Sequence, residues 1–234
     1  MTQERRDSLA ADGTPPTERA RVRRHPERGA YDRAVSDAIL DQALYCHVAW
    51  VDDSGSPRIV PTIHVRVGEV LYIHGSNASR TLKAGKAGGE IAVCVTLLDG
   101  LVLARSAFNH SMNYRSVVAY GPAREVTDPD EKWNAQRALV DHVIAGRSAE
   151  ARMPDQRELD QTTILAIDLN EVSAKVRTGP PKDDERDLDL GVGAGVLPLE
   201  QVPGAPLPSP DLRVEVDVPA SVRNYARPDG DRRD

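Results

Sequence analysis

Apolar and polar residues alternate with the period of a β-strand along much of the stretch from Tyr45 to Gly75. The runs YCHVAWV, RIVPTIHVRV and VLYIHG are separated by DDSGSP and by Gly68-Glu69, which are typical of tight turns. The pattern therefore predicts three antiparallel strands in succession. Pro61 lies inside the second run and has no N–H to donate, so it indicates a bulge or an edge strand, and bulges often lie beside ligand sites.

The same pattern predicts further strands downstream. The runs IAVCVTLLDG, LVLARSAFN, RSVVAYG and PAREVT predict four of them, with Asp99-Gly100 as the hairpin turn between the first two. The runs TTILAIDLN and EVSAKVR predict the last strands. Many short strands at regular spacing, with few helices between them, indicate a mainly β protein that closes into a small, Greek-key-like barrel.

Two segments have helical patterns. Asp32 to Leu44 has apolar residues near helical spacing and predicts a short amphipathic helix. A longer helix is predicted to begin at Asp128 as N-cap, with Pro129 in the first position, Glu131 completing a capping box and Gly146 at the far end. The residues that we expect on its buried face are Trp133, Val140, Val143 and Ile144.

The composition divides the chain into three parts. Residues 1–20 are polar and aperiodic and predict a disordered arm, and residues 21–178 predict the folded domain. Residues 179–234 are rich in Pro, Gly and Asp and predict an extended tail with one apolar anchor, Gly195 to Leu199. Such a tail either wraps a neighbouring subunit or stays disordered, and the sequence leaves both readings open.

Charge and hydropathy exclude several classes of function. A net charge of −6 disfavours sequence-independent binding of nucleic acid, which needs a positive surface. No apolar run approaches the ~20 residues that span a bilayer, and the N-terminus lacks the apolar region of a secretory signal. Cys46 and Cys94 lie in strand-like runs and predict free, buried thiols rather than a disulfide or a metal pair. We therefore expect a cytoplasmic protein.

The stretch LYIHGSNASRTLKAGKAGG, from Leu71 to Gly89, has the features of an anion site. It predicts a strand, a tight turn at Gly75 and a short helix whose first turn carries hydroxyl groups and cations. Free N–H groups and the positive end of the helix dipole then meet basic side chains, which suits a phosphate. The residues that we expect to hold it are Ser76, Ser79, Arg80 and Lys83.

Four segments together resemble a known family: RRHPERGAYD, LYIHGSNASR, HSMNYRSVVAYG and AKVRTGPPKDD. The chain resembles the flavin-binding split barrels of the pyridoxamine 5'-phosphate oxidase superfamily over about residues 21–200. Within that superfamily it is most similar to the branch of the 5-nitroimidazole-resistance (Nim) proteins. The resemblance implies a homodimer of six-stranded split barrels with FMN at the dimer interface. The paired basic and aromatic residues that bind substrate phosphate in pyridoxamine oxidases have no counterpart here, so that activity is not expected.

The resemblance also implies roles for individual residues. Pro61, Thr62 and Ile63 would pass the isoalloxazine ring, and Asn113, Tyr114, Arg115 and Ser116 would reach the ring or the phosphate from the interface strand. His74 or Tyr114 would deliver a proton to the substrate.

Three functions remain open from the sequence. The first is an FMN-dependent oxidoreductase that reduces nitro-aromatic or other electron-poor small molecules. The second keeps the barrel but binds haem, with His74, His64 or His110 as the axial ligand. The third is a flavin carrier or sensor without turnover. His110 has a second interpretation, because it also lies where a side chain would cap the turn before the interface strand.

Overall fold

Six strands form a closed barrel in the computed structural model, which describes residues 13–226. They are β2 (Tyr45–Val51), β3 (Pro57–Val67), β4 (Val70–Ser76), β5 (Glu90–Leu103), β6 (Ser111–Glu125) and β7 (Thr162–Asp168). Their order is β6-β7-β4-β3-β2-β5, and a further pairing of β5 with β6 closes the ring. The prediction of a mainly β, closed barrel is confirmed.

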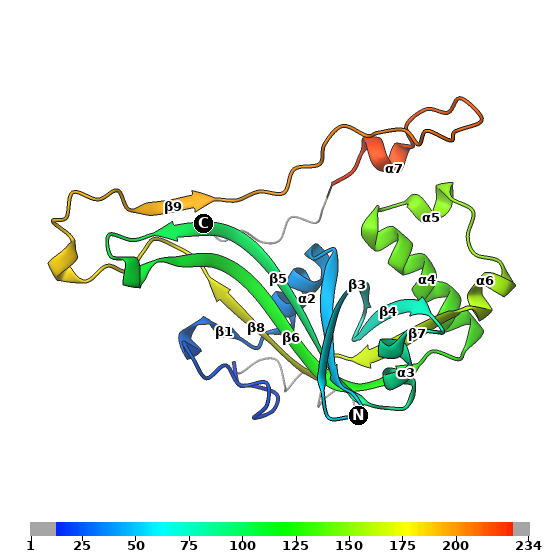
Figure 1. The fold of residues 1–234 in the computed structure, drawn as a ribbon, viewed down its shortest axis with the longest axis horizontal. Helices are drawn as coiled ribbons and strands as arrows, with labels where there is room; N and C mark the ends of the chain where they lie inside the picture. Colours follow the sequence, from blue (N-terminus) through cyan, green and yellow to red (C-terminus); the bar gives the residue numbers. More distant parts are fainter. Residues whose placement is uncertain (1–12, 227–234) are drawn as a thin grey trace.

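Strand β6 is the point at which the barrel is split. It pairs with β5 from Ser111 to Pro122, while its other edge pairs with β8 (Glu171–Arg177) at first and with β7 only near its end. Two short strands extend the sheet: β1 (Gly29–Ala30) beside β8, and β9 (Gly195–Pro198) beside β5. The β5–β6 pair projects beyond the barrel as a long arm, with the 3-10 turn η2 (Ala107–Asn109) at its tip (Figure 1).

The hairpin predicted at Asp99-Gly100 is wrong. Strand β5 runs straight through this dipeptide, and the register with β6 shifts between Leu98 and Gly100, which makes a bulge. Arg115 of β6 explains the bulge, because its guanidinium donates to both carboxylate oxygens of Asp99, at 3.0 and 2.7 Å, and also to Gln42. The chain turns at η2 instead, so the four predicted strands are two long ones.

Helix α2 (Arg33–Gln42) fills one side of the core, as predicted. Its Ile39 and Leu40 pack against inward-facing residues of the barrel. Two histidines cover the carbonyl groups at its C-terminal end, which lack partners within the helix. His64 Nε2 lies 3.0 Å from the oxygen of Leu40, and His142 Nε2 lies 2.8 Å from the oxygen of Ala43.

Helix α4 (Pro129–Val143) covers β3, β4 and β7 and is followed by α5 (Arg147–Glu150) and α6 (Gln156–Asp160). The predicted N-cap is confirmed, since the Asp128 carboxylate accepts the Glu131 N–H at 2.7 Å. The capping box is not formed, because the Glu131 carboxylate instead accepts from Tyr72 and Arg124. The buried residues of α4 are Ala135 and Leu139 rather than the predicted set, of which Trp133 is exposed while Val140, Val143 and Ile144 are half-buried.

Helix α3 (Arg80–Lys86) lies directly on the barrel wall. Gly85 makes this contact, because a Cβ atom there would lie 2.2 Å from Leu165 Cδ1 and 3.2 Å from Ala123 Cβ. The helix therefore rests on β6 and β7, near the last residues of β6.

The segment before β1 is part of the folded body, so disorder up to residue 20 is wrong for residues 13–20. Ala20 is buried, and Arg19 forms ion pairs with Glu90 and Glu171, both at 2.8 Å. The Arg19 guanidinium also lies 4.9 Å from the centroid of the Tyr120 ring. Residues 1–12 of the predicted arm lie outside the described residues.

The tail is anchored by β9, as predicted. Leu199 N continues this pairing to the oxygen of Asp99 at 3.1 Å, and the exposed segment that follows leads to α7 (Ala220–Arg223). There Ser221 contacts the carboxylate of Glu150. Figure 1 shows the tail crossing from the arm towards α5. Among the described residues, no helix has both the length and the apolar character needed to cross a membrane.

The Arg115–Asp99 pair at the bulge generates a stability prediction. Arg115→Ala is expected to lower the free energy of unfolding by about 1–3 kcal/mol, because it leaves the half-buried carboxylate of Asp99 without its ion-pair partner. The measurement is urea unfolding followed by circular dichroism. Arg58→Ala is the matched control, since Arg58 pairs with Asp52 at 2.7 Å but is 45% exposed. An equal shift of the midpoint in both variants would contradict a special role for the bulge.

Candidate functional site

The turn between β4 and α3 is held rigidly by its own backbone and by Asn77. Ser79 N donates to the oxygen of Ser76 at 2.9 Å, and the Ser76 hydroxyl accepts from Ala78 N at 3.2 Å. The Asn77 side chain donates to the oxygen of Asp160 at 2.8 Å and accepts from Thr163 Oγ1 at 2.6 Å. Ser79 is the N-cap of α3, but its hydroxyl makes no capping bond. Within residues 13–226 that hydroxyl forms no hydrogen bond, so it can bind a ligand.

Arg80 and Lys83 are the cations of this turn and helix, and both are exposed. Neither side chain forms an ion pair or a hydrogen bond with any residue in the range 13–226. Lys86, on the same helix, is paired with Glu125 at 2.6 Å. Residues three apart on a helix lie on one face, so Arg80 and Lys83 present two uncompensated positive charges together. This arrangement suits an anion.

His74 lies on β4, just before this turn. Its ring is half-buried, and its Nδ1 atom has no hydrogen-bond partner among the described residues. Burial lowers the pKa of His74, so the imidazole is mainly neutral at pH 7. Its neutral ring can therefore act as a proton acceptor or as an N–H donor.

The predicted ring-contacting residues of β3 lie on an open face of the sheet. Pro61 and Ile63 are exposed, and they stand opposite His47 and Tyr45 of β2 in register. The rings of Tyr45 and His47 are 5.7 Å apart. Sequence reasoning gave His47 no functional role. The alternation of buried Cys46 with exposed neighbours on either side is the signal that places His47 on this open face.

The β6 residues are largely occupied by contacts within the chain. Asn113 is buried, donates to the oxygen of Gly179 at 3.2 Å and accepts from Arg177, while Arg115 is held by Asp99. Ser116 Oγ donates to the oxygen of Lys175 at 3.3 Å. In this arrangement Asn113 and Arg115 stabilise the chain itself. Tyr114 is half-buried, and among the described residues its hydroxyl forms no hydrogen bond.

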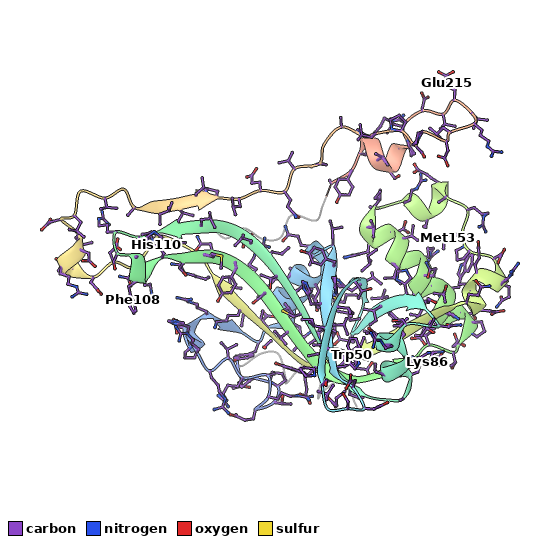
Figure 2. All side chains as sticks on the ribbon, viewed as in Figure 1. Trp50, Lys86, Phe108, His110, Met153 and Glu215 are labelled. Carbon is purple, nitrogen blue, oxygen red and sulfur yellow. The ribbon has the colours of Figure 1, made fainter. Side chains whose placement is uncertain are left out.

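The two other histidines predicted as haem ligands differ sharply. His64 is fully buried beneath α2, which assigns it a structural role. His110 is exposed at the tip of the arm beside Phe108 (Figure 2). Its Nδ1 lies 3.0 Å from the oxygen of Ser106. Because a carbonyl only accepts, Nδ1 carries the proton and Nε2 keeps a free lone pair. His110 thus both caps its turn and offers a metal-binding nitrogen.

Comparison with known proteins gives two similar structures, and in each the match covers nearly the whole of the other protein. The flavocytochrome Anf3 of Azotobacter vinelandii is 36% identical, with 91% of this chain and 99% of that chain covered and a TM-score of 0.85. An FAD and heme binding protein of Mycobacterium smegmatis is 39% identical, with 86% and 98% covered and a TM-score of 0.81.

A more distant structure shows a shared fold only. A candidate 5-nitroimidazole antibiotic resistance protein of Bacteroides thetaiotaomicron is 19% identical, with 63% of this chain and 86% of that chain covered and a TM-score of 0.54. No curated protein matches the sequence. The family model described as pyridoxamine 5'-phosphate oxidase matches residues 32–176, which is more than half of the chain. The chain therefore belongs to the pyridoxamine 5'-phosphate oxidase family.

Proposed function

We propose that this protein is a flavin-dependent redox protein that also binds haem. The observation that carries the flavin assignment is the pair of cations Arg80 and Lys83, which no described carboxylate neutralises. The names of the two similar structures, a flavocytochrome and an FAD and heme binding protein, support both cofactors together. The sequence presents FMN and haem as alternatives, whereas we propose that the protein binds both a flavin and haem.

A flavin phosphate fits the turn before α3. Guanidinium and ammonium groups bind phosphate oxygens through charge-assisted hydrogen bonds, and the Ser79 hydroxyl adds a neutral donor. These contacts serve the phosphate of FMN and of FAD equally well. We keep FMN as the prediction for this chain.

The open face of β2 and β3 would receive the ring of the flavin. When bound, the flavin supplies the electron-transfer chemistry. Pro61 and Ile63 provide an exposed apolar surface, and Thr62 lies between them on the strand. His74 would exchange a proton with a substrate through its neutral ring, and Tyr114 remains a second candidate donor. Nitro-aromatic and other electron-poor small molecules are the substrate class that we propose.

For the haem we propose His110 as the axial ligand. A metal-bound histidine usually donates its second N–H to a carbonyl or a carboxylate, which orients the ring. His110 has this arrangement through Ser106, with Nε2 left available. Phe108, which is 92% exposed, adds an apolar surface at the same tip. His110 thereby replaces His64 as the better candidate, because His64 is enclosed by the core.

We further propose that two copies of this chain form a homodimer. Large apolar side chains are exposed along the open face of the barrel and the arm: Tyr45, Ile63, Leu98, Leu101 and Met112. Such a continuous apolar face is typical of an interface. A second copy would cover this face, and the cofactors would then be enclosed between subunits.

The first prediction concerns the flavin. Arg80→Ala should weaken FMN binding at least roughly tenfold, because it removes one charge-assisted contact with the phosphate. The measurement is fluorescence titration of flavin-free protein with FMN. Lys86→Ala is the matched control, since Lys86 lies on the same helix but is paired with Glu125. Equal FMN affinity in Arg80→Ala and the wild type would remove the support for this site.

The second prediction concerns the haem. His110→Ala should lose the absorption spectrum of axially ligated haem when the protein is reconstituted, because it removes the nitrogen bound to iron. The comparison is made by visible absorption and electron paramagnetic resonance. His25→Ala is the control, because His25 is also exposed but lies 3.1 Å from Glu27. An unchanged spectrum in His110→Ala would show that another residue binds the iron. His47 and His74 would then be substituted in turn.

The third prediction concerns the dimer. Leu101→Glu and Met112→Glu should each shift the protein from dimer to monomer, because they place a charge in the apolar interface. Sedimentation equilibrium at several concentrations measures the mass. Trp133→Glu, on the exposed side of α4, serves as the control and should leave the dimer intact. A wild-type protein that sediments as a monomer would contradict the interface.

A further inference from the structure

Two arginines near the start of β6 have no role in the flavin site. Arg177 ends β8 and is only 7% exposed. Its guanidinium donates to Asn113 Oδ1, to the oxygen of Gly179 at 3.4 Å and to the oxygen of Pro180 at 3.3 Å. All three acceptors are neutral. Within residues 13–226 Arg177 forms no ion pair, so its buried charge is not neutralised by the described chain.

Arg28 directly precedes Gly29, which pairs with Lys175 of β8, two residues before Arg177. It belongs to the 3-10 turn η1 (Pro26–Arg28), and its side chain is 22% exposed. Its only ion pair with a described residue is a loose one of 3.8 Å to Glu27, a carboxylate that His25 also contacts. Burial lowers the pKa of Arg177 and the positive charge of Arg28 lowers it further, while Tyr114 acts in the opposite direction.

The backbone holds this unfavourable pair in place. Gly29 and Ala30 of β1 pair with Lys175 and Ala174 of β8, which fixes the preceding turn against β8. The Lys175 ammonium adds a hydrogen bond of 2.8 Å to the oxygen of Arg24. The positions of Arg28 and Arg177 therefore follow from strand pairing and not from any attraction between their side chains.

Other half-buried arginines of the chain are neutralised. Arg115 is paired with Asp99 at 2.7 Å, and Arg66 is paired with Asp41 and Asp37. Burying a guanidinium costs free energy unless an anion accompanies it, and two neighbouring guanidinium groups increase that cost. A ligand carrying carboxylate or phosphate groups would remove the cost. The Arg28–Arg177 pair thus has the properties of an anion site.

Position along β6 distinguishes this site from the flavin phosphate site. Arg177 stands opposite Tyr114 in the pairing of β8 with β6. Tyr114 is four residues after His110, which corresponds to roughly 13 Å between these two residues along an extended strand. Ala123, which contacts α3, is nine residues further on, or roughly 30 Å. The pair therefore lies at the His110 end of β6, and a phosphate held by Arg80 of the same chain does not reach it.

We propose that Arg28 and Arg177 form a second anion site, which binds the propionate carboxylates of the haem whose iron is ligated by His110. This inference rests on the haem part of the proposed function. A guanidinium binds a carboxylate through two parallel hydrogen bonds, so each arginine takes one propionate. His110 at the tip of the arm and Arg177 at the end of β8 would then hold opposite parts of the same haem.

The test compares two probes that differ only in charge: haem and haem dimethyl ester, in which both propionates are neutral. Haem-free protein is titrated with each probe, and binding is followed by visible absorption. Arg28→Gln and Arg177→Gln should each weaken haem binding at least roughly tenfold but leave ester binding unchanged. Arg177→Lys should recover part of the affinity for haem. Arg24→Gln is the matched control, because it removes an exposed charge from the same segment.

Each outcome decides a separate point. Arg28→Gln keeps the test valid if Arg177→Gln disturbs folding, since the one contact of the Arg28 side chain with a described residue is the loose ion pair with Glu27. Haem affinity equal to that of the wild type in both glutamine variants overturns the second anion site and leaves the haem proposal intact. A loss of FAD or FMN affinity with unchanged haem affinity assigns the pair to a flavin phosphate and overturns the inference. A wild-type protein that binds no haem overturns the haem part of the proposed function as well.

Discussion

The architecture depends on how strand β6 divides its hydrogen bonds. A strand has two edges, and β6 gives one of them to β5 over almost its entire paired length. The other edge serves β8 from Tyr114 to Tyr120 and then β7 from Ala123 to Glu125. Because β7 and β8 are consecutive strands, the chain must leave the barrel where β6 changes partner. The two ends of β6 consequently lie in different parts of the molecule. Its last residues lie beside α3, and its first residues belong to the arm.

This division separates two groups of basic residues. Arg80 and Lys83 lie on α3, near the last residues of β6, while Arg28 and Arg177 lie near its beginning. Most other arginines of the described residues are paired with carboxylates. Strand pairing and the contact of Gly85 with Leu165 hold both groups of cations in position. The proposed flavin phosphate site and the proposed second anion site therefore lie at opposite ends of β6.

Local sequence signals predicted much of this fold, and long-range contacts account for the failures. Alternation predicted the strands, and Asp128 and Pro129 predicted the start of α4 because these signals act within a few residues. Asp99-Gly100 is compatible with a hairpin and with a bulge, and the contact with Arg115 on the neighbouring strand selects the bulge. Local signals also could not predict the role of Asn113, because its hydrogen-bond partner Arg177 is 64 residues away in the sequence.

The histidines show why residue type alone did not determine the site. His64, His74 and His110 are equivalent in the sequence as nitrogen ligands, but their surroundings differ. His64 is fully buried and contacts the carbonyl of Leu40. Burial lowers the pKa of His74, whose Nδ1 has no hydrogen-bond partner among the described residues, so that ring is mainly neutral. The carbonyl of Ser106 requires a proton on Nδ1 of His110 and therefore directs the lone pair of Nε2 outwards. The backbone acceptor beside each ring, which strand alternation does not predict, decides which chemistry that ring can perform.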